Sequence, residues 1–365
     1  MIDSHGHPIS EQGGPLDLSA ITLELAQDEA GRRRRSELAP GRLSQELMAV
    51  RLAGYLGCSV DELGLAHSQA SAHWPGYVAG LFSDAGIEGV VLDPGSYETD
   101  PSPAAATLAG LSSCQVRSIM RLDPLVDRLI AEDATASEII KAAEAAVRLA
   151  REQGYVGLKT IIAYRTGLEV DPGASLKDAD LSLRTTKDWP TRRRGKALRD
   201  LICRRSLGLA AELDLPIQFH TGFGDSELRL YEANPLSLEE LLLTPEGSAA
   251  TVVLIHGAYP WHEELAYLAS VRPNVHAELS LFNLFAPATV AQRLESVLEL
   301  APSAKVLCGT DGHGSPESFW FAAHTLRDAW TTVRRDWAKR GARQAWLSSV
   351  EQAIFQGNTA RLYHF

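Results

Sequence analysis

The sequence predicts an α/β protein of the (β/α)8 TIM-barrel class, and three features of the chain support this. Short apolar runs rich in β-branched residues alternate with helical stretches, which is the pattern of a parallel sheet covered on both faces. Several runs end in a polar side chain, and barrel active sites lie at the C-terminal ends of the strands. The chain has 365 residues, enough for one barrel with insertions, and we expect a single domain over residues 1–365.

The first half of the chain predicts three strands and a large insertion. We expect strands at residues 2–5, 89–93 and 116–123. The segment 10–75 predicts a helical insertion that acts as a lid over the barrel mouth, because Leu43, Leu47, Val50 and Leu52 have helical spacing. The third strand precedes one helix with Leu125 and Leu129 and an alanine-rich helix at about 137–152, which ends at a glycine.

The second half predicts five more strands, at residues 156–159, 216–220, 252–256, 275–281 and 305–311. Residues 171–190 are rich in Asp, Lys, Thr and Gly, and we expect a long loop there, because such segments are commonly lids or binding loops. A helix at about 191–213 should pack outside the barrel. C-terminal helices should fill the remainder and end at residues 357–358.

Composition narrows the function classes. The chain has 35 basic and 46 acidic residues, a net charge of −11, which argues against nucleic-acid and membrane partners. Four scattered cysteines indicate neither a thiolate zinc site nor a disulfide framework, and no leader or spanning segment is evident, so we expect a cytoplasmic protein. The run at residues 32–35 consists of arginines, but acidic neighbours favour a solvated helix face.

The candidate metal ligands follow from position. In an extended strand, His5 and His7 point the same way, where two imidazoles can bind one ion. Four later strands end in further candidate ligands, namely Lys159, His220, His256 and Asp311.

This ordered set resembles the amidohydrolase superfamily, whose barrel members carry His-x-His after strand one, Lys or Glu on strand four, His on strands five and six and Asp on strand eight. Longer stretches resemble a narrower branch, the amidohydrolase-like domain of plant nodulin-related and fungal sporulation-signal proteins, which is fused to a glutamine-synthetase-like domain. The segments that carry this likeness are 158–168, 220–225 with 234–235, 259–260 before 267–271, and 310–312 with 316–317. Glu278 departs from the branch, where an aspartate is expected.

The resemblance implies a divalent metal, zinc before manganese or iron, held by His5, His7 and Asp311. Such a metal lowers the pKa of bound water to roughly 7, and Asp311 would take the proton and pass it to the leaving amine. If Lys159 is carbamylated, it would bridge two ions with His220 and His256 on the second. With one ion, His220 joins the first metal and His256 polarises the substrate carbonyl. A free Lys159 paired with Asp311 or with a substrate carboxylate is the remaining alternative.

Substrate-binding candidates lie just past the strand ends. Arg165 could bind a substrate carboxylate through paired hydrogen bonds, or form a loop salt bridge. Arg121 has a similar role or pairs with Asp123. Asp225 and Glu317 are candidates to bind a substrate amine, and His313 is a further substrate contact.

Together these features predict a metal-dependent amidohydrolase that cleaves a C–N bond in a small carboxylate-bearing substrate, such as a γ-glutamyl amide or an N-acyl amino acid. The alternatives are a metal-dependent non-oxidative decarboxylase and a catalytically idle signalling or scaffold module. The pattern leaves self-association open. Since the sequence stops at Phe365, the resemblance implies that a separate glutamine-synthetase-like enzyme acts alongside it.

Overall fold

The computed structural model describes residues 1–24 and 28–365, and it is built on short parallel strands. In chain order these are β1 (Ile2–Ile9), β2 (Gly89–Leu92), β3 (Gln115–Ser118), β4 (Met120–Arg121), β5 (Leu158–Thr160), β6 (Ile217–His220), β7 (Val252–Ile255), β8 (Val275–Leu279), β9 (Val306–Cys308) and β10 (Gly312–Gly314). Each observed pairing is parallel, in the orders β10-β1-β2-β3 and β4-β5-β6-β7-β8-β9.

The two sheets follow one another around a barrel because two predicted strands are each interrupted. Between β3 and β4 stands only Ile119, whose N–H donates to Leu92 while the next N–H, from Met120, donates to Gly157. Between β9 and β10, the N–H of Asp311 donates to the carbonyl of His5 at 2.8 Å. The α/β barrel class is therefore confirmed. The third predicted strand is divided into β3 and β4, and the eighth, predicted to end at residue 311, ends at Cys308 and is followed by the separate strand β10.

The interior between the strands is filled by side chains. Val91, Val253, Ile255 and Leu307 are fully buried in one cluster with Tyr363 from the last helix. Such close packing makes the barrel interior a core rather than a channel. A site on this fold is therefore expected beyond the C-terminal ends of the strands.

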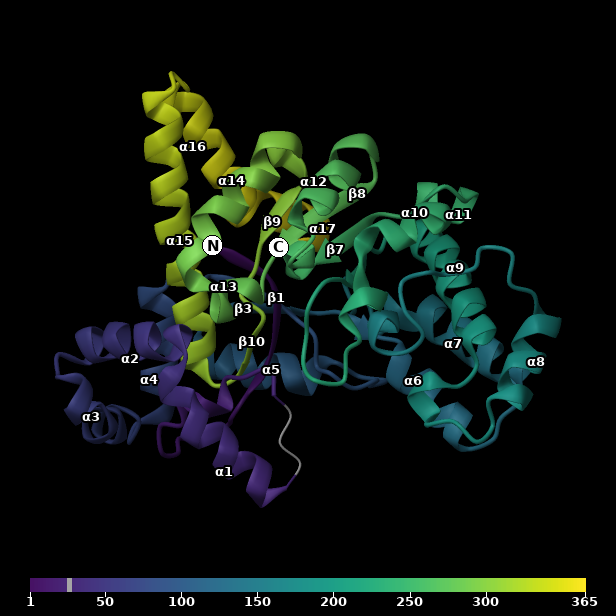
Figure 1. Ribbon diagram of the computed structural model, residues 1–365, viewed down its shortest axis with the longest axis horizontal. Coiled ribbons are helices and arrows are strands. Elements are labelled where there is room, and N and C mark those ends of the chain that lie inside the picture. The colour runs from purple at the N-terminus through teal and green to yellow at the C-terminus, as the bar shows by residue number, and fades with distance from the viewer. Residues whose placement is uncertain (25–27) are drawn as a thin grey trace.

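Helices surround the strands (Figure 1). They are α1 (Glu29–Leu38), α2 (Leu43–Leu56), α3 (Leu63–Ala70), α4 (Trp74–Asp84), α5 (Ser102–Ser112), α6 (Asp123–Ala131), α7 (Ala136–Ala150), α8 (Leu176–Thr185), α9 (Lys196–Glu212), α10 (Glu239–Leu242), α11 (Pro245–Ala249), α12 (His262–Val271), α13 (Phe282–Phe285), α14 (Val290–Leu300), α15 (Pro316–Lys339), α16 (Gln344–Gln352) and α17 (Asn358–Tyr363). The helices α1 to α3 lie within residues 10–75, and α4 carries the helical region on to Asp84.

The predicted long loop at 171–190 is wrong, because its centre is the helix α8. A reciprocal capping box between Ser175 and Asp178 begins this helix, and Ala179 and Leu183 bury its apolar side. The segment was misread because its polar composition hid the helical spacing of these few apolar residues. Figure 1 shows α8 at the opposite end of the molecule from α3.

Two helix boundaries also differ from prediction. The helix expected from residue 191 begins only at Lys196, after Gly195, whose φ of 68° lies in the left-handed region. The chain does not end its helices at 357–358, because a π-helical turn, Ala353–Gly357, leads directly into α17. Among the helices of the described residues, none is long and apolar enough to cross a membrane.

Candidate metal centre

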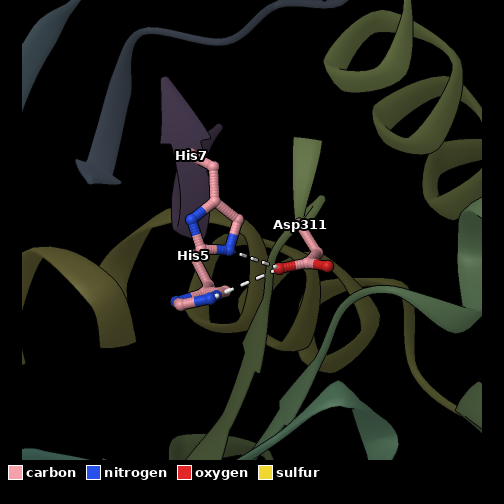
Figure 2. Close-up of side chains that lie close together, drawn as sticks. All are labelled: His5, His7 and Asp311. Carbon is pink, nitrogen blue, oxygen red and sulfur yellow. Dashed lines mark ion pairs between the residues drawn. The ribbon is translucent and has the colours of Figure 1, made fainter. Parts of the chain in front are cut away.

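Three side chains at the upper end of the barrel form a compact cluster of potential metal ligands. The Nε2 atoms of His5 and His7 each lie 3.3 Å from Oδ1 of Asp311. Figure 2 shows both imidazoles turned toward this carboxylate, and one ligand atom from each residue lies within 4.8 Å of the others. Two histidines and one carboxylate are a common ligand set for zinc and related divalent ions.

The local sequence explains how these side chains come together. His5 and His7 alternate with Gly6 along β1, so both rings point to the same side. Gly6 points to the other side, where an added Cβ would lie only 2.5 Å from the ring of Phe319 on α15. Asp311 has a φ of 53°, an unfavourable angle for a non-glycine residue, which places its carboxylate beside the two rings.

The polar atoms of the cluster are unusually lacking in partners. Neither ring nitrogen of the fully buried His5 has a hydrogen bond in the described structure, and neither does Oδ1 of Asp311. Nδ1 of His7 lies 2.9 Å from the carbonyl of Asp93, so this nitrogen donates and Nε2 carries the free lone pair. Because unpaired buried polar atoms are costly, these atoms fit a bound cation.

Burial and neighbouring charges shift the pKa values of several residues at the site. Burial, and next the charge of Lys159, holds the pKa of His5 well below its usual range. Burial also lowers the pKa of His220 and His256. Burial alone would raise the pKa of Asp311, but the neighbouring His7 and His5 outweigh it and hold that pKa well below its usual range. Neutral imidazoles and an ionised carboxylate are the binding forms of these ligands.

The cluster opens into a cavity of about 710 Å³, which we call the metal cavity. Lys159, His220 and His256 line it from neighbouring strand ends, together with His313, whose Nδ1 lies 2.8 Å from the carbonyl of Asp311. The rings of His220 and His256 have centroids 4.4 Å apart, and those of His5 and His256 5.3 Å apart. All six predicted ligands therefore lie at or around one cavity, as the strand-end pattern predicts.

Lys159 is buried beneath this cavity. Its side chain forms no ion pair with Asp311 within the described part of the chain, so that one alternative for a free lysine is not observed. Burial lowers the pKa of Lys159 to about 8, against the opposing charge of Asp93. Burial therefore makes the neutral amine more accessible near neutral pH than it is for an exposed lysine.

His256 is held by a hydrogen-bonded chain from the barrel interior. Its Nδ1 lies 2.9 Å from Oγ of Ser280, and that hydroxyl donates to Oε2 of Glu278 at 2.8 Å. With the hydroxyl directed to Glu278, His256 donates through Nδ1 and its Nε2 lone pair is free. His256 also has a φ of 70°, a second strained backbone position at the site. Glu278, whose role was doubtful, thus contributes through Ser280 rather than by entering the cavity.

Both predicted substrate-binding arginines line the metal cavity, but each is anchored by an aspartate. Arg121 pairs with Asp93 at 2.6 Å, so the expected alternative partner Asp123 is wrong. Arg165 contacts Oδ2 of Asp127 at 2.8 Å through both Nε and Nη2, the loop salt bridge that was one of its two alternatives. These contacts use one edge of each guanidinium, which leaves the Nη1 side for a ligand.

Of the two carboxylates predicted to bind a substrate amine, only one lies at the metal cavity. Asp225 lines the metal cavity, and burial raises its pKa. Glu317 does not line it, because its buried carboxylate accepts hydrogen bonds from His67 at 3.0 Å and from Tyr77 at 2.8 Å. The expected amine-binding role of Glu317 is therefore wrong, because His67 of the insertion and Tyr77 of α4 hold its carboxylate from elements far away in the sequence.

The sequence-based prediction lacks two charged or aromatic residues that line the cavity, Arg35 and Tyr164, and one residue that supports it, Asp93. Arg35, the last of the arginine run, lines the metal cavity, and its Nε is buried without a hydrogen bond. Tyr164 also lines it, with its ring packed edge-on against His220 at 4.6 Å. Asp93 anchors both Arg121 and, through its carbonyl, His7. Only Asp93 carried a usable signal, as a polar residue directly after the second strand.

Comparisons with known proteins agree with this geometry. The amidohydrolase family model matches residues 123–365, more than half of the chain. Protein fluG of Emericella nidulans is 35% identical over 231 residues, 57% of this chain, and the chain spans only about 25% of that relative. A Lactobacillus casei structure assigned as a metal-dependent hydrolase is 25% identical with a TM-score of 0.86, covering 100% of this chain and 95% of that one.

A third likeness concerns the fold alone. The uronate isomerase of Thermotoga maritima is 12% identical with a TM-score of 0.69, covering 100% of this chain and 94% of that chain. The family match begins at residue 123, so the first strand, with His5 and His7, lies outside it. The chain therefore belongs to the amidohydrolase family, a member of the metal-dependent amidohydrolase superfamily.

Proposed function

We propose that this protein hydrolyses a C–N bond, an amide in a small substrate that carries a carboxylate. The observation that carries the proposal is the His5, His7 and Asp311 cluster, whose buried atoms lack partners, in a cavity that Arg121 and Arg165 also line. The cluster favours a cation, and the guanidinium groups favour an anionic head group.

The residues present fit a divalent ion. His5, His7 and Asp311 would hold it, with zinc favoured over manganese or iron. When bound, such an ion supplies an activated water at neutral pH and polarises a carbonyl oxygen. A second ion would be held by a carbamylated Lys159 with His220 and His256. The contact with Ser280 leaves a lone pair on Nε2 of His256, and a nitrogen with a lone pair can bind a metal ion but cannot donate a hydrogen bond to a substrate carbonyl.

Asp311 would move the proton. Its ionised carboxylate would accept a proton from water as the carbonyl carbon is attacked, and return it to the nitrogen as the C–N bond breaks. The products are one carboxylic acid and one amine, so atoms and protons balance. The low pKa of Asp311 keeps its carboxylate ionised across the neutral range.

The remaining cavity residues would orient the substrate. Arg121 and Arg165 are held by Asp93 and Asp127, so their free edges are fixed before a ligand arrives, which reduces the entropy lost on binding. Asp225 would accept a hydrogen bond from a substrate ammonium group. A head group with a carboxylate for the arginines and an ammonium group for Asp225 is that of a γ-glutamyl amide. An N-acyl amino acid is the alternative. A cytosolic location and action beside a separate glutamine-synthetase-like enzyme remain predictions.

Product identity tests the proposal. Protein purified without added metal would be analysed for metal, then incubated with γ-glutamyl amides, N-acyl amino acids and aromatic carboxylic acids. Released amine with an equal amount of acid supports hydrolysis. Carbon dioxide without amine would instead establish decarboxylation, and an absence of both metal and turnover would establish an idle module.

A further inference from the structure

A second cavity, of about 640 Å³, adjoins the metal cavity, and no step of the mechanism uses it. We call it the side cavity. The two cavities share walls, because the segment 22–24 after the first strand and the loop residues Gly224 and Asp225 line both. The two cavities are therefore immediate neighbours within the described residues, separated by no more than the side chains that line both.

The distinctive lining of the side cavity is apolar. It comes from the insertion, from the start of α2 and from the end of α13 with the turn that follows, and consists of Leu23, Leu43, Phe285, Ala286, Pro287 and Ala288. Leu43 is 55% exposed although its neighbours Ser44 and Gln45 are buried. Leu43 therefore presents an apolar side chain to the side cavity, and a wall made mainly of such side chains is typical of a pocket that binds an apolar group.

The polar groups of the side cavity are largely paired with each other. Nη1 of Arg42 donates to Oγ1 of Thr22 at 2.6 Å, and its Nη2 lies 3.4 Å from Oε2 of Glu24. The N–H of Ser226 donates to the carbonyl of Leu23 at 3.0 Å, which joins the two walls. Since the one arginine already has a carboxylate partner, the cavity offers apolar contact rather than a second anion site.

We propose that the substrate carries an apolar tail, an alkyl or aryl group, which lies in the side cavity while its head group and scissile amide lie in the metal cavity. This inference rests on the proposed function and narrows its substrate class. The carboxylate-binding arginines and the side cavity would then act on opposite ends of one molecule. Small amides without a tail would be poor substrates.

The test is a chain-length series. γ-Glutamyl amides of primary amines from ethylamine to decylamine, and N-acyl glutamates from acetyl to decanoyl, would be assayed for kcat/KM and for Kd. We expect kcat/KM to rise with each methylene by up to about fourfold, the factor that corresponds to about 0.8 kcal/mol per buried methylene. No dependence on tail length in either series would overturn the inference.

Variants of the side cavity test whether the dependence on tail length arises there. Leu43→Asp places a charge in the side cavity at the first position of α2, where an acidic residue suits the helix, and should lower the ratio of long-tail to short-tail kcat/KM at least tenfold. Leu43→Met should keep that ratio. Leu65→Asp is the matched control, because Leu65 is 67% exposed on α3 and lines neither cavity. An equal loss for Leu43→Asp and Leu65→Asp would contradict the assignment.

The Kd values distinguish a failure of the side-cavity inference from a failure of the proposed amide hydrolysis. If neither series is hydrolysed, the amide proposal fails, but the Kd values still report on the side cavity. Tighter binding of longer tails that Leu43→Asp abolishes would support the side cavity without the reaction. Binding that ignores tail length would reject it whatever the reaction is.

Discussion

Asp311→Asn tests the centre of the proposed chemistry, because it changes a ligand and a proton carrier at once. The amide keeps the shape of the side chain, and its oxygen can still lie near the Nε2 atoms that are now 3.3 Å from Oδ1 of Asp311. It can neither carry the negative charge nor accept a proton from water. General acid–base catalysis contributes about 10²- to 10⁴-fold, or roughly 3–5 kcal/mol of barrier. We expect kcat to fall by at least about a hundredfold.

The assay measures amine release at saturating substrate and metal, with metal content measured on the same samples. Asp225→Asn is the matched control, because Asp225 lines the same cavity but lies outside the ligand cluster, and it should keep metal while raising KM. Thermal melting confirms that both variants fold. If Asp311→Asn retains turnover within about tenfold of the native protein, roughly 1.4 kcal/mol, Asp311 does not move the proton.

Three further predictions use the same protein. The double variant His5→Ala/His7→Ala should lose its metal, because one carboxylate cannot replace two imidazoles, and full metal occupancy in that variant would refute the ligand assignment. Arg165→Lys keeps a charge beside Asp127 but loses the planar fork, so it should raise KM more than it lowers kcat, and equal activity on analogues without a carboxylate would remove Arg165 from substrate binding. Burial raises the pKa of Glu278 to about 8, above its unfolded value, so its contribution to stability is present below about pH 4.5 and is lost as the pH rises through 8. The metal-free protein should therefore melt at lower temperature at pH 9 than at pH 6, and Glu278→Gln should reduce that difference, whereas an unchanged difference would contradict the assignment.

The sequence by itself determined the barrel class and most of the charged and histidine residues that line its metal cavity. Both depend on short-range patterns, because a strand alternates its side chains with a period of two and barrel strands present their C-terminal ends at one face. His5 and His7 share a side of β1 for this reason alone. His220 and His256 meet them because they end or directly follow a buried strand, and Lys159 meets them from within the three-residue strand β5. A loop was predicted in place of the helix α8, although the capping box of this helix is also a local signal. The polar composition of residues 171–190 masks the helical spacing of their few apolar residues.

Only the tertiary structure decided which charged groups meet. Arg121 pairs with Asp93, which directly follows β2, instead of with Asp123. Glu317 pairs with His67 of the insertion, 250 residues away in the sequence, and this contact holds its carboxylate outside the metal cavity. Arg35 enters that cavity although the rest of its run stays exposed. Ion pairs of this kind depend on which elements pack together and on how deeply each side chain is desolvated. The spacing of residues in the sequence predicts neither the packing of distant elements nor the desolvation of a side chain. Long flexible side chains pair with whichever opposite charge lies nearest in the folded structure.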